Sequence, residues 1–154
     1  RFPGEIELLF ARVLYFDLVG DNQNSERDLK QIIRIQPNDS RALNHLGYML
    51  ATKTSRFEEA NTLIEQAIKI SPEDPAIIDS LAWIQYKLGR FDKAFKNIAR
   101  AYERFPDPEV ASHMGEILWA LDRREEALSV WNQALEINPN SAIILEAMER
   151  LQSQ

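Results

Sequence analysis

The stretch PAIIDSLAWIQYKLGRFDKAFKNIARAYERFP, residues 75–106, decides the fold of this chain. Most of its residues favour helix, and its breaks are the phrase Gly89-Arg90 in the middle and a proline at either end. Proline cannot continue a helix, because it lacks the backbone N–H and its ring clashes with the preceding turn. The stretch therefore predicts two helices, over 75–88 and 91–104, joined by a short turn.

The same pattern recurs along the chain with a period near 34 residues. Prolines that follow a helical segment are Pro37, Pro72, Pro106 and Pro139, with spacings of 35, 34 and 33 residues. Small residues recur in phase with them: Gly47, Ala82 and Gly115, then Ala60, Ala94 and Ala127, then Ala67, Ala101 and Ala134. Two antiparallel helices approach closely only where side chains are small. The period therefore predicts a series of tightly packed helical hairpins.

The landmarks divide the chain into repeats. Helices are expected near 5–19, 25–35, 41–53, 57–70, 75–88, 91–104, 109–121, 124–137 and 141–152. They form a degenerate repeat over 5–39, with Val13, Ser25 and Ile32 at the small positions, and repeats over 40–74, 75–107 and 108–140. One extra residue near 52–54 is placed in a hairpin turn. The last helix carries an apolar stripe and is expected to cap the fourth repeat, within one domain over 1–154.

Composition excludes several classes of function. The 154 residues carry a net charge of −6 and no cysteine, so disulfides, thiolate nucleophiles and cysteine-ligated zinc are ruled out. No basic stripe indicates nucleic-acid binding, and no apolar run approaches the roughly 18 residues that span a bilayer. His113 and Glu116 share a helix face, and we interpret them as a surface polar pair rather than metal ligands. We expect no catalytic residues, no metal and no cofactor.

The repeated landmarks resemble the tetratricopeptide repeat family. This resemblance implies an all-α, right-handed superhelix of hairpins whose first helices line a concave groove that holds a protein or an extended peptide. The matching groove positions, carried over from the family pattern, are Arg41, Asn44, Tyr48 and Ala51, then Ala76, Asp79, Trp83 and Tyr86, then Glu109, Ser112, Glu116 and Trp119.

The aromatic groove positions have two interpretations. Exposed Trp and Tyr are typical of binding hot spots, but Trp83 and Trp119 are equally suited to packing between adjacent first helices. Trp131, on a second helix, is expected in the core. Asn44 could bind a peptide backbone with its amide. The acidic residues among the groove positions make a basic clamp for a carboxylate a poor fit, so a neutral, apolar or basic segment is expected.

A more specific resemblance covers roughly residues 25–150. The runs Leu46-Gly47-Tyr48, 79–83 (DSLAW) and 105–119 (FPDPEVASHMGEILW) are similar to the C-terminal part of proteobacterial outer-membrane tetratricopeptide lipoproteins. Members of that group are periplasmic adaptors for a carboxy-terminal processing protease. The resemblance implies an envelope adaptor on the periplasmic side of the outer membrane, with its lipid anchor upstream of this chain; a cytoplasmic location is the alternative.

The N-terminal end suggests a second class of function. The chain opens on Arg1 without an initiator methionine, so we expect a fragment or a processed product. The degenerate first repeat places Phe2, Leu8, Leu9 and Phe10 where further repeats or a second copy of the chain would lie. The alternative to a peptide-binding scaffold is therefore a structural module that forms a homo-oligomer through this end.

Overall fold

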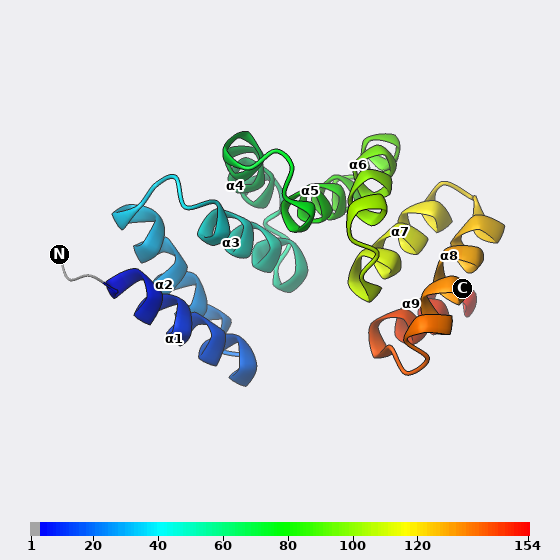
Figure 1. Ribbon diagram of the computed structural model, residues 1–154, viewed down its shortest axis with the longest axis horizontal. Coiled ribbons are helices and arrows are strands. Elements are labelled where there is room, and N and C mark those ends of the chain that lie inside the picture. Colours follow the sequence, from blue (N-terminus) through cyan, green and yellow to red (C-terminus); the bar gives the residue numbers. More distant parts are fainter. Residues whose placement is uncertain (1–3) are drawn as a thin grey trace. The chain divides into compact units, whose positions relative to one another are not determined.

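The computed structural model describes residues 4–154, and this part of the chain is a succession of nine helices (Figure 1). Their bounds are α1 Glu5–Val19, α2 Asn22–Ile35, α3 Ser40–Lys53, α4 Phe57–Ile70, α5 Pro75–Lys87, α6 Phe91–Arg104, α7 Pro108–Ala120, α8 Arg124–Ile137 and α9 Ala142–Gln152. The all-α prediction is confirmed. The expected apolar role of Phe2 lies outside the described residues.

The helices pack as two compact units. Unit 1 is residues 1–72, where α1 packs on α2, α2 on α3, and α3 on α4. Unit 2 is residues 73–154, where α5 pairs with α6, α7 with α8, and α9 packs against α7 and α8. The division falls between the predicted second and third repeats. The expectation of a single domain over 1–154 stays a prediction.

Aspartates start the first helices of the hairpins. Asp39 caps α3, Asp74 caps α5 and Asp107 caps α7, and each side chain accepts a hydrogen bond from a backbone N–H of the first turn. These bonds satisfy donors that have no partner inside the helix. Pro75 and Pro108 occupy the first position of α5 and α7, where the missing N–H costs nothing. Pro72 and Pro106 thus follow the end of one hairpin, and Pro75 and Pro108 help to start the next.

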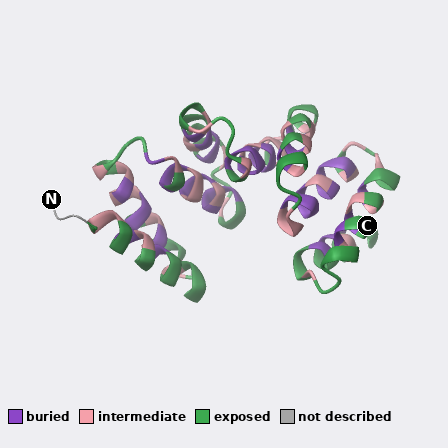
Figure 2. Cartoon of the chain, viewed as in Figure 1, coloured by how far each residue is buried: buried purple, intermediate pink, exposed green. Residues whose placement is uncertain are grey.

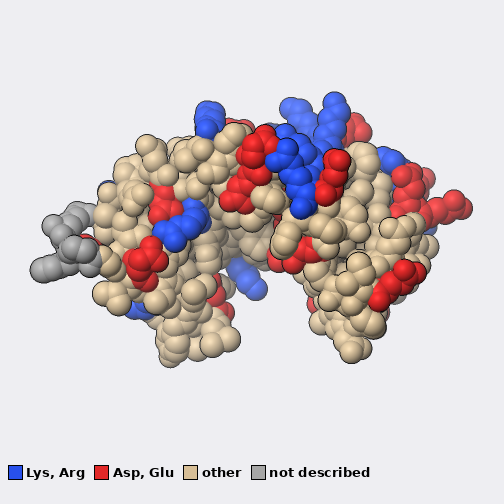
Figure 3. All heavy atoms as spheres, in the orientation of Figure 1, with Lys and Arg blue, Asp and Glu red and all other residues tan. Residues whose placement is uncertain are grey.

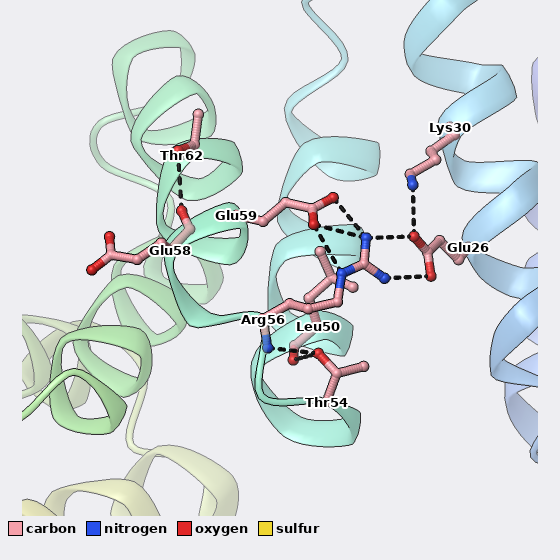
Figure 4. A network of polar contacts seen from close by, with 8 residues as sticks. All are labelled: Glu26, Lys30, Leu50, Thr54, Arg56, Glu58, Glu59 and Thr62. Atoms are coloured by element: carbon pink, nitrogen blue, oxygen red, sulfur yellow. Dashed lines mark hydrogen bonds and ion pairs between the residues drawn. The ribbon is translucent and has the colours of Figure 1, made fainter.

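Left-handed residues close three of the four hairpin turns. Gly20 follows α1 with φ 76°, Gly89 follows α5 with φ 75°, and Asp122 follows α7 with φ 60°. The turn after α3 differs, because Thr54 closes it: its hydroxyl donates to the Leu50 carbonyl and accepts from the Arg56 N–H (Figure 4). This is the region where the sequence carries an extra residue.

The small residues at the repeated positions lie at the helix contacts. Those predicted in the second, third and fourth repeats are all buried, and so are Val13, Ser25 and Ile32 of the degenerate repeat (Figure 2). The closest approach is at Gly115 of α7, where an added Cβ would lie 2.0 Å from Nε1 of Trp131 on α8. The Trp131 indole is fully buried and donates to the Ser112 carbonyl at 3.3 Å. Its predicted core position is confirmed.

Ion pairs fasten unit 1 around its apolar interior. Arg56, in the turn before α4, makes a bidentate pair with Glu26 of α2 at 2.9 and 3.0 Å and also binds Glu59 (Figure 4). These hydrogen bonds lower the pKa of Glu26. The buried Asp28 of α2 accepts from Arg12 of α1 at 2.7 Å, which lowers the pKa of that carboxyl as well. The Arg56–Glu26 pair joins the two hairpins of unit 1, and the Arg12–Asp28 pair joins the two helices of its first hairpin.

The last helix closes unit 2 as predicted. Ile144, Ala147 and Leu151 of α9 are buried in one apolar cluster with Trp131 of α8. Leu128 and Leu135 of α8 pack against the same cluster. Ile143, near the start of the same helix, is exposed.

Helix boundaries follow the predicted layout closely, with one clear exception. The second helix begins at Asn22 rather than at 25, because the Asp21 carboxylate accepts from the Asn24 N–H and caps the helix one turn earlier. The polar run 21–24 carries this capping signal, which apolar periodicity alone does not register.

Replacing Gly115 with alanine tests the closest helix contact. Gly115→Ala is expected to lower the free energy of unfolding by about 1–3 kcal/mol, because the new methyl group overlaps the rigid Trp131 ring. Gly47→Ala is the comparison variant: its Cβ would lie 2.8 Å from Cδ1 and Cγ1 of the buried Ile64 and 3.2 Å from the Ala60 carbonyl oxygen, a smaller overlap than at Gly115, and the better helix propensity of alanine, about 1 kcal/mol, offsets part of it, so its loss should be smaller. Urea unfolding followed by circular dichroism measures both. Equal losses in the two variants would contradict this account.

Candidate functional site

Four of the predicted groove positions belong to unit 1, on α3; Ala51 is buried there, and the other three are Arg41, Asn44 and Tyr48. The exposed Arg41 binds Glu7 of α1 at 3.1 Å and Asp39 at 3.3 Å, and its guanidinium lies 4.5 Å from the centre of the Phe10 ring. The hydrogen bonds that Arg41 donates to Asp39 and Glu7 raise the pKa of its guanidinium. Its charge is therefore already engaged by neighbouring side chains of unit 1.

Asn44 and Tyr48 are half-buried on the same helix. The Oδ1 atom of Asn44 is buried and has no hydrogen-bond partner among residues 4–154. An acceptor of this kind costs free energy until a donor reaches it. Asn44 therefore keeps a side-chain acceptor that no donor among these residues reaches.

In unit 2 the buried Asp79 of α5 pairs with a histidine. Its Oδ1 lies 2.9 Å from Nδ1 of His113 on α7, and both side chains are almost fully buried. The prediction that His113 forms a surface pair with Glu116 is therefore wrong. A buried carboxylate needs a partner, and the neighbouring first helix supplies it.

Trp83 of α5 packs between first helices. Its ring stacks on His113 at a centroid distance of 4.0 Å and on Tyr86 at 4.9 Å, and Lys87 Nζ lies 4.9 Å from its centre. The side chain is buried, and its Nε1 has no hydrogen-bond partner among the described residues. Of the two interpretations of Trp83, this geometry matches packing between adjacent first helices; a role in binding stays a prediction.

Glu116 and Ser112 of α7 face the capping helix. The buried Glu116 is ion-paired with Arg150 of α9, and the Ser112 hydroxyl donates to the Ile143 carbonyl at 3.3 Å. Burial, together with the nearby Glu116 carboxylate, raises the pKa of Tyr86. The five predicted positions Asp79, Trp83, Tyr86, Ser112 and Glu116 thus lie along α5 and α7, which pack against each other.

Trp119 lies near the end of α7 and is half-buried. Its ring stacks on Trp131 at 5.9 Å, and the Arg124 guanidinium lies 5.0 Å from its centre. Trp119 and Tyr86 are 33 residues apart, at the same position of successive repeats. They are the predicted aromatics of unit 2 that keep accessible surface.

Three polar pairs on the first helices went unpredicted, and they share one spacing. Glu7 and Arg41, Asp79 and His113, and Glu116 and Arg150 are each 34 residues apart. A separation of one repeat places two residues side by side on successive first helices. A search for complementary residues at this spacing would have found all three. His45, which binds Asp17 at 2.6 Å, falls outside this spacing.

The described residues carry no cluster of three or more His, Asp or Glu side chains that could hold a metal ion. Within residues 4–154, no helix is long and apolar enough to cross a membrane. Acidic and basic side chains are interspersed over the face shown in Figure 3. The first helices of unit 2 carry the half-buried rings of Tyr86 and Trp119, beside carboxylates that are paired within the unit.

Models of the tetratricopeptide repeat match three successive stretches of the chain, residues 10–75, 51–112 and 109–141. Together these stretches run through both units, and the hairpins have the packing described above. The chain is a tetratricopeptide repeat protein. Its domain is of a kind that generally serves as a scaffold for protein partners, which agrees with the predicted class of function.

Known tetratricopeptide proteins give the same picture. The chain is 41% identical, over 116 residues, to the TPR repeat-containing protein PA4667 of Pseudomonas aeruginosa; the match covers 75% of this chain and 20% of that protein. The crystal structure of TTC0263, a tetratricopeptide protein of Thermus thermophilus, covers 98% of this chain and 81% of that one at 21% identity, with a TM-score of 0.80.

The fold also resembles part of an enzyme. A mutant O-GlcNAc transferase of Thermobaculum terrenum aligns over 73% of this chain and 22% of its own, at 24% identity and a TM-score of 0.69. At this identity the likeness concerns the fold alone. The tetratricopeptide arrangement therefore occurs both in repeat proteins such as TTC0263 and inside a longer transferase.

The packing of Trp83 predicts a large stability effect. Trp83→Ala should lower the free energy of unfolding by about 3–5 kcal/mol, because it empties a buried site between α5 and α7. Trp119→Ala, at a half-buried position, should cost clearly less. Urea unfolding of the two variants, followed by circular dichroism, measures the difference. A small loss for Trp83→Ala would mean that the ring is not a packing element.

Proposed function

We propose that this chain is a non-catalytic scaffold that binds an extended protein segment along the first helices of its hairpins. The observation that carries the proposal is the pair Tyr86 and Trp119. They lie at equivalent positions of adjacent first helices and keep accessible surface, although most apolar side chains of α5 and α7 are buried. Amphipathic aromatic rings of this kind carry much of the energy of protein interfaces.

The groups around the two rings suggest the kind of segment that binds. Lys87 lies over the ring of Tyr86, and Arg124 over that of Trp119, while the carboxylates of Asp79 and Glu116 are occupied by His113 and Arg150. Such a surface does not need a free basic clamp that would bind a terminal carboxylate. A segment with apolar side chains fits these rings of unit 2 best.

The biological role that we propose is that of an envelope adaptor. The support is the similarity to the Pseudomonas protein, together with the resemblance of residues 25–150 to outer-membrane tetratricopeptide lipoproteins. On this proposal the chain works on the periplasmic side of the outer membrane and brings protein substrates to a carboxy-terminal processing protease. The matched segment is 20% of the Pseudomonas protein, so the activity of a whole protein of that length is part of the proposal.

Replacing the two aromatic rings with leucine side chains tests the binding surface. The double variant Tyr86→Leu, Trp119→Leu keeps apolar contacts but removes the aromatic and hydrogen-bonding parts, and it should weaken binding of the purified protease or its substrate at least about tenfold. Phe105→Leu is the matched control, because Phe105 is an exposed aromatic at the end of α6. Calorimetric titration gives the affinities, and circular dichroism confirms that all variants are folded.

The two parts of the proposal fail in different ways. Binding that is unchanged in the double variant would overturn the surface but leave the scaffold intact. Failure of the purified protease and its substrates to bind the unmodified chain would overturn the adaptor role.

Location is tested separately on the full-length protein. We expect it in the outer-membrane fraction, with its repeats accessible to protease only after the outer membrane is permeabilised. Recovery from the soluble cytoplasmic fraction would overturn the periplasmic assignment.

A further inference from the structure

The second helix of the third repeat differs in charge from the other second helices. Counted with the residue that precedes it, α6 carries five basic and two acidic residues, a net charge of +3. The same count gives −1 for α4, −1 for α8 and zero for α2. The chain as a whole carries −6. The positive charge on α6 is therefore local and opposite in sign to that of the chain.

The basic side chains of α6 share one face of the helix. Lys93, Lys96 and Arg100 are all exposed, while Ala94 and Ile98 are buried against neighbouring helices. At about 100° per residue the three basic residues fall within an arc of about 60°. Figure 3 shows basic side chains gathered over α5 and α6, with acidic ones beside them. We call Lys93, Lys96 and Arg100 the α6 basic face.

Lys93 lies at a position where the fold itself favours an acidic residue. It is the third residue of α6, in the first turn, where the helix dipole stabilises negative charge. In α4 and α8 the third residue is a glutamate that binds the arginine preceding the helix. These pairs are Glu59 with Arg56 at 2.9 Å and Glu126 with Arg123 at 2.8 Å.

In α6 the same two positions hold Arg90 and Lys93, which are both positive. Like charges at this spacing disfavour a helix. Within residues 4–154, no ion pair involves Lys93 or Lys96. The stability of the hairpin therefore gives no reason for a lysine at position 93.

We propose that the α6 basic face binds an acidic segment of a protein partner. Charge complementarity identifies this kind of occupant. Lys93 and Arg100 lie about 10 Å apart along the helix, a span over which a short segment can place two or three carboxylates. A nucleic acid or an anionic membrane presents a continuous array of negative charge. The exposed Asp92 and Glu103, at one margin of the face, would repel such an array.

This face is separate from the aromatic surface. Tyr86 and Trp119 lie on the first helices α5 and α7, whereas the α6 basic face lies on a second helix. A scaffold with both surfaces can hold an apolar segment on one and an acidic partner on the other. The inference goes beyond the proposed function and stands or fails independently of it.

Reversing two charges of the face tests the proposal. The probe is a labelled oligoglutamate peptide, and fluorescence anisotropy measures its affinity. The double variant Lys93→Glu, Lys96→Glu should weaken binding at least about tenfold, and added salt should weaken binding to the unmodified chain. Lys53→Glu, Lys69→Glu is the matched control: both lysines are exposed near helix ends, and the change in net charge is the same. Its affinity should stay within about twofold of the unmodified chain.

A stability measurement separates a binding face from a structural one. Lys93→Glu alone should raise the urea midpoint of unfolding, because it gives α6 the glutamate that α4 and α8 have, and it should still weaken binding. A lowered midpoint would mean that Lys93 serves the fold, and it would overturn the proposal.

The binding data can also overturn the proposal. They do so if the unmodified chain fails to bind the peptide, or if the control loses as much affinity as the double variant. Tighter binding of duplex DNA or phosphatidylglycerol vesicles than of the peptide has the same consequence. The variant Tyr86→Leu, Trp119→Leu should bind the peptide as the unmodified chain does, and a loss there would place the peptide on the aromatic surface instead.

Discussion

The close approach of helices at small residues is the constraint on which both units depend. A hairpin can bury its apolar side chains only if its two helices come near enough to exclude water, and residues such as Gly115, Ala94 and Ala127 permit this distance. The helices come closest at Gly115, where the Trp131 indole occupies the space that a Cβ atom would need. The regular spacing of proline, aspartate caps and small residues serves the same end, because it delivers each pair of helices in register.

The same packing decides what a binding surface on this protein can be made of. The first helices contact one another through side chains that would otherwise face a partner. Asp79, Trp83 and Glu116 are therefore buried in contacts within unit 2. What remains accessible are rings and charged stems at the edge of these contacts, chiefly Tyr86 and Trp119. Affinity on such a surface would come from a few aromatic anchors held rigid by their stacking neighbours.

Sequence periodicity predicted the helices well because the signals are local. A proline, a left-handed glycine or a run of apolar residues acts within a few positions, so most boundaries lie within one residue of those expected. The start of α2 was missed because its signal is the Asp21 cap and not apolar spacing. The site was harder to predict. The family pattern identifies the face of a helix, but the burial of Trp83 and the pairing of His113 depend on which side chains the next repeat brings to that face.

The polar pairs 34 residues apart have a consequence for the identity of each repeat. In an idealised array every hairpin is interchangeable, but here Asp79 in one repeat is completed by His113 in the next, and Glu116 by Arg150 of the terminal helix. A hairpin moved, duplicated or deleted would bring a buried carboxylate beside the wrong neighbour, at a cost set by its lost hydration. The pairs therefore make each repeat specific for its neighbour. They specify the order in which hairpins follow one another, and the apolar pattern shared by all repeats carries no such information.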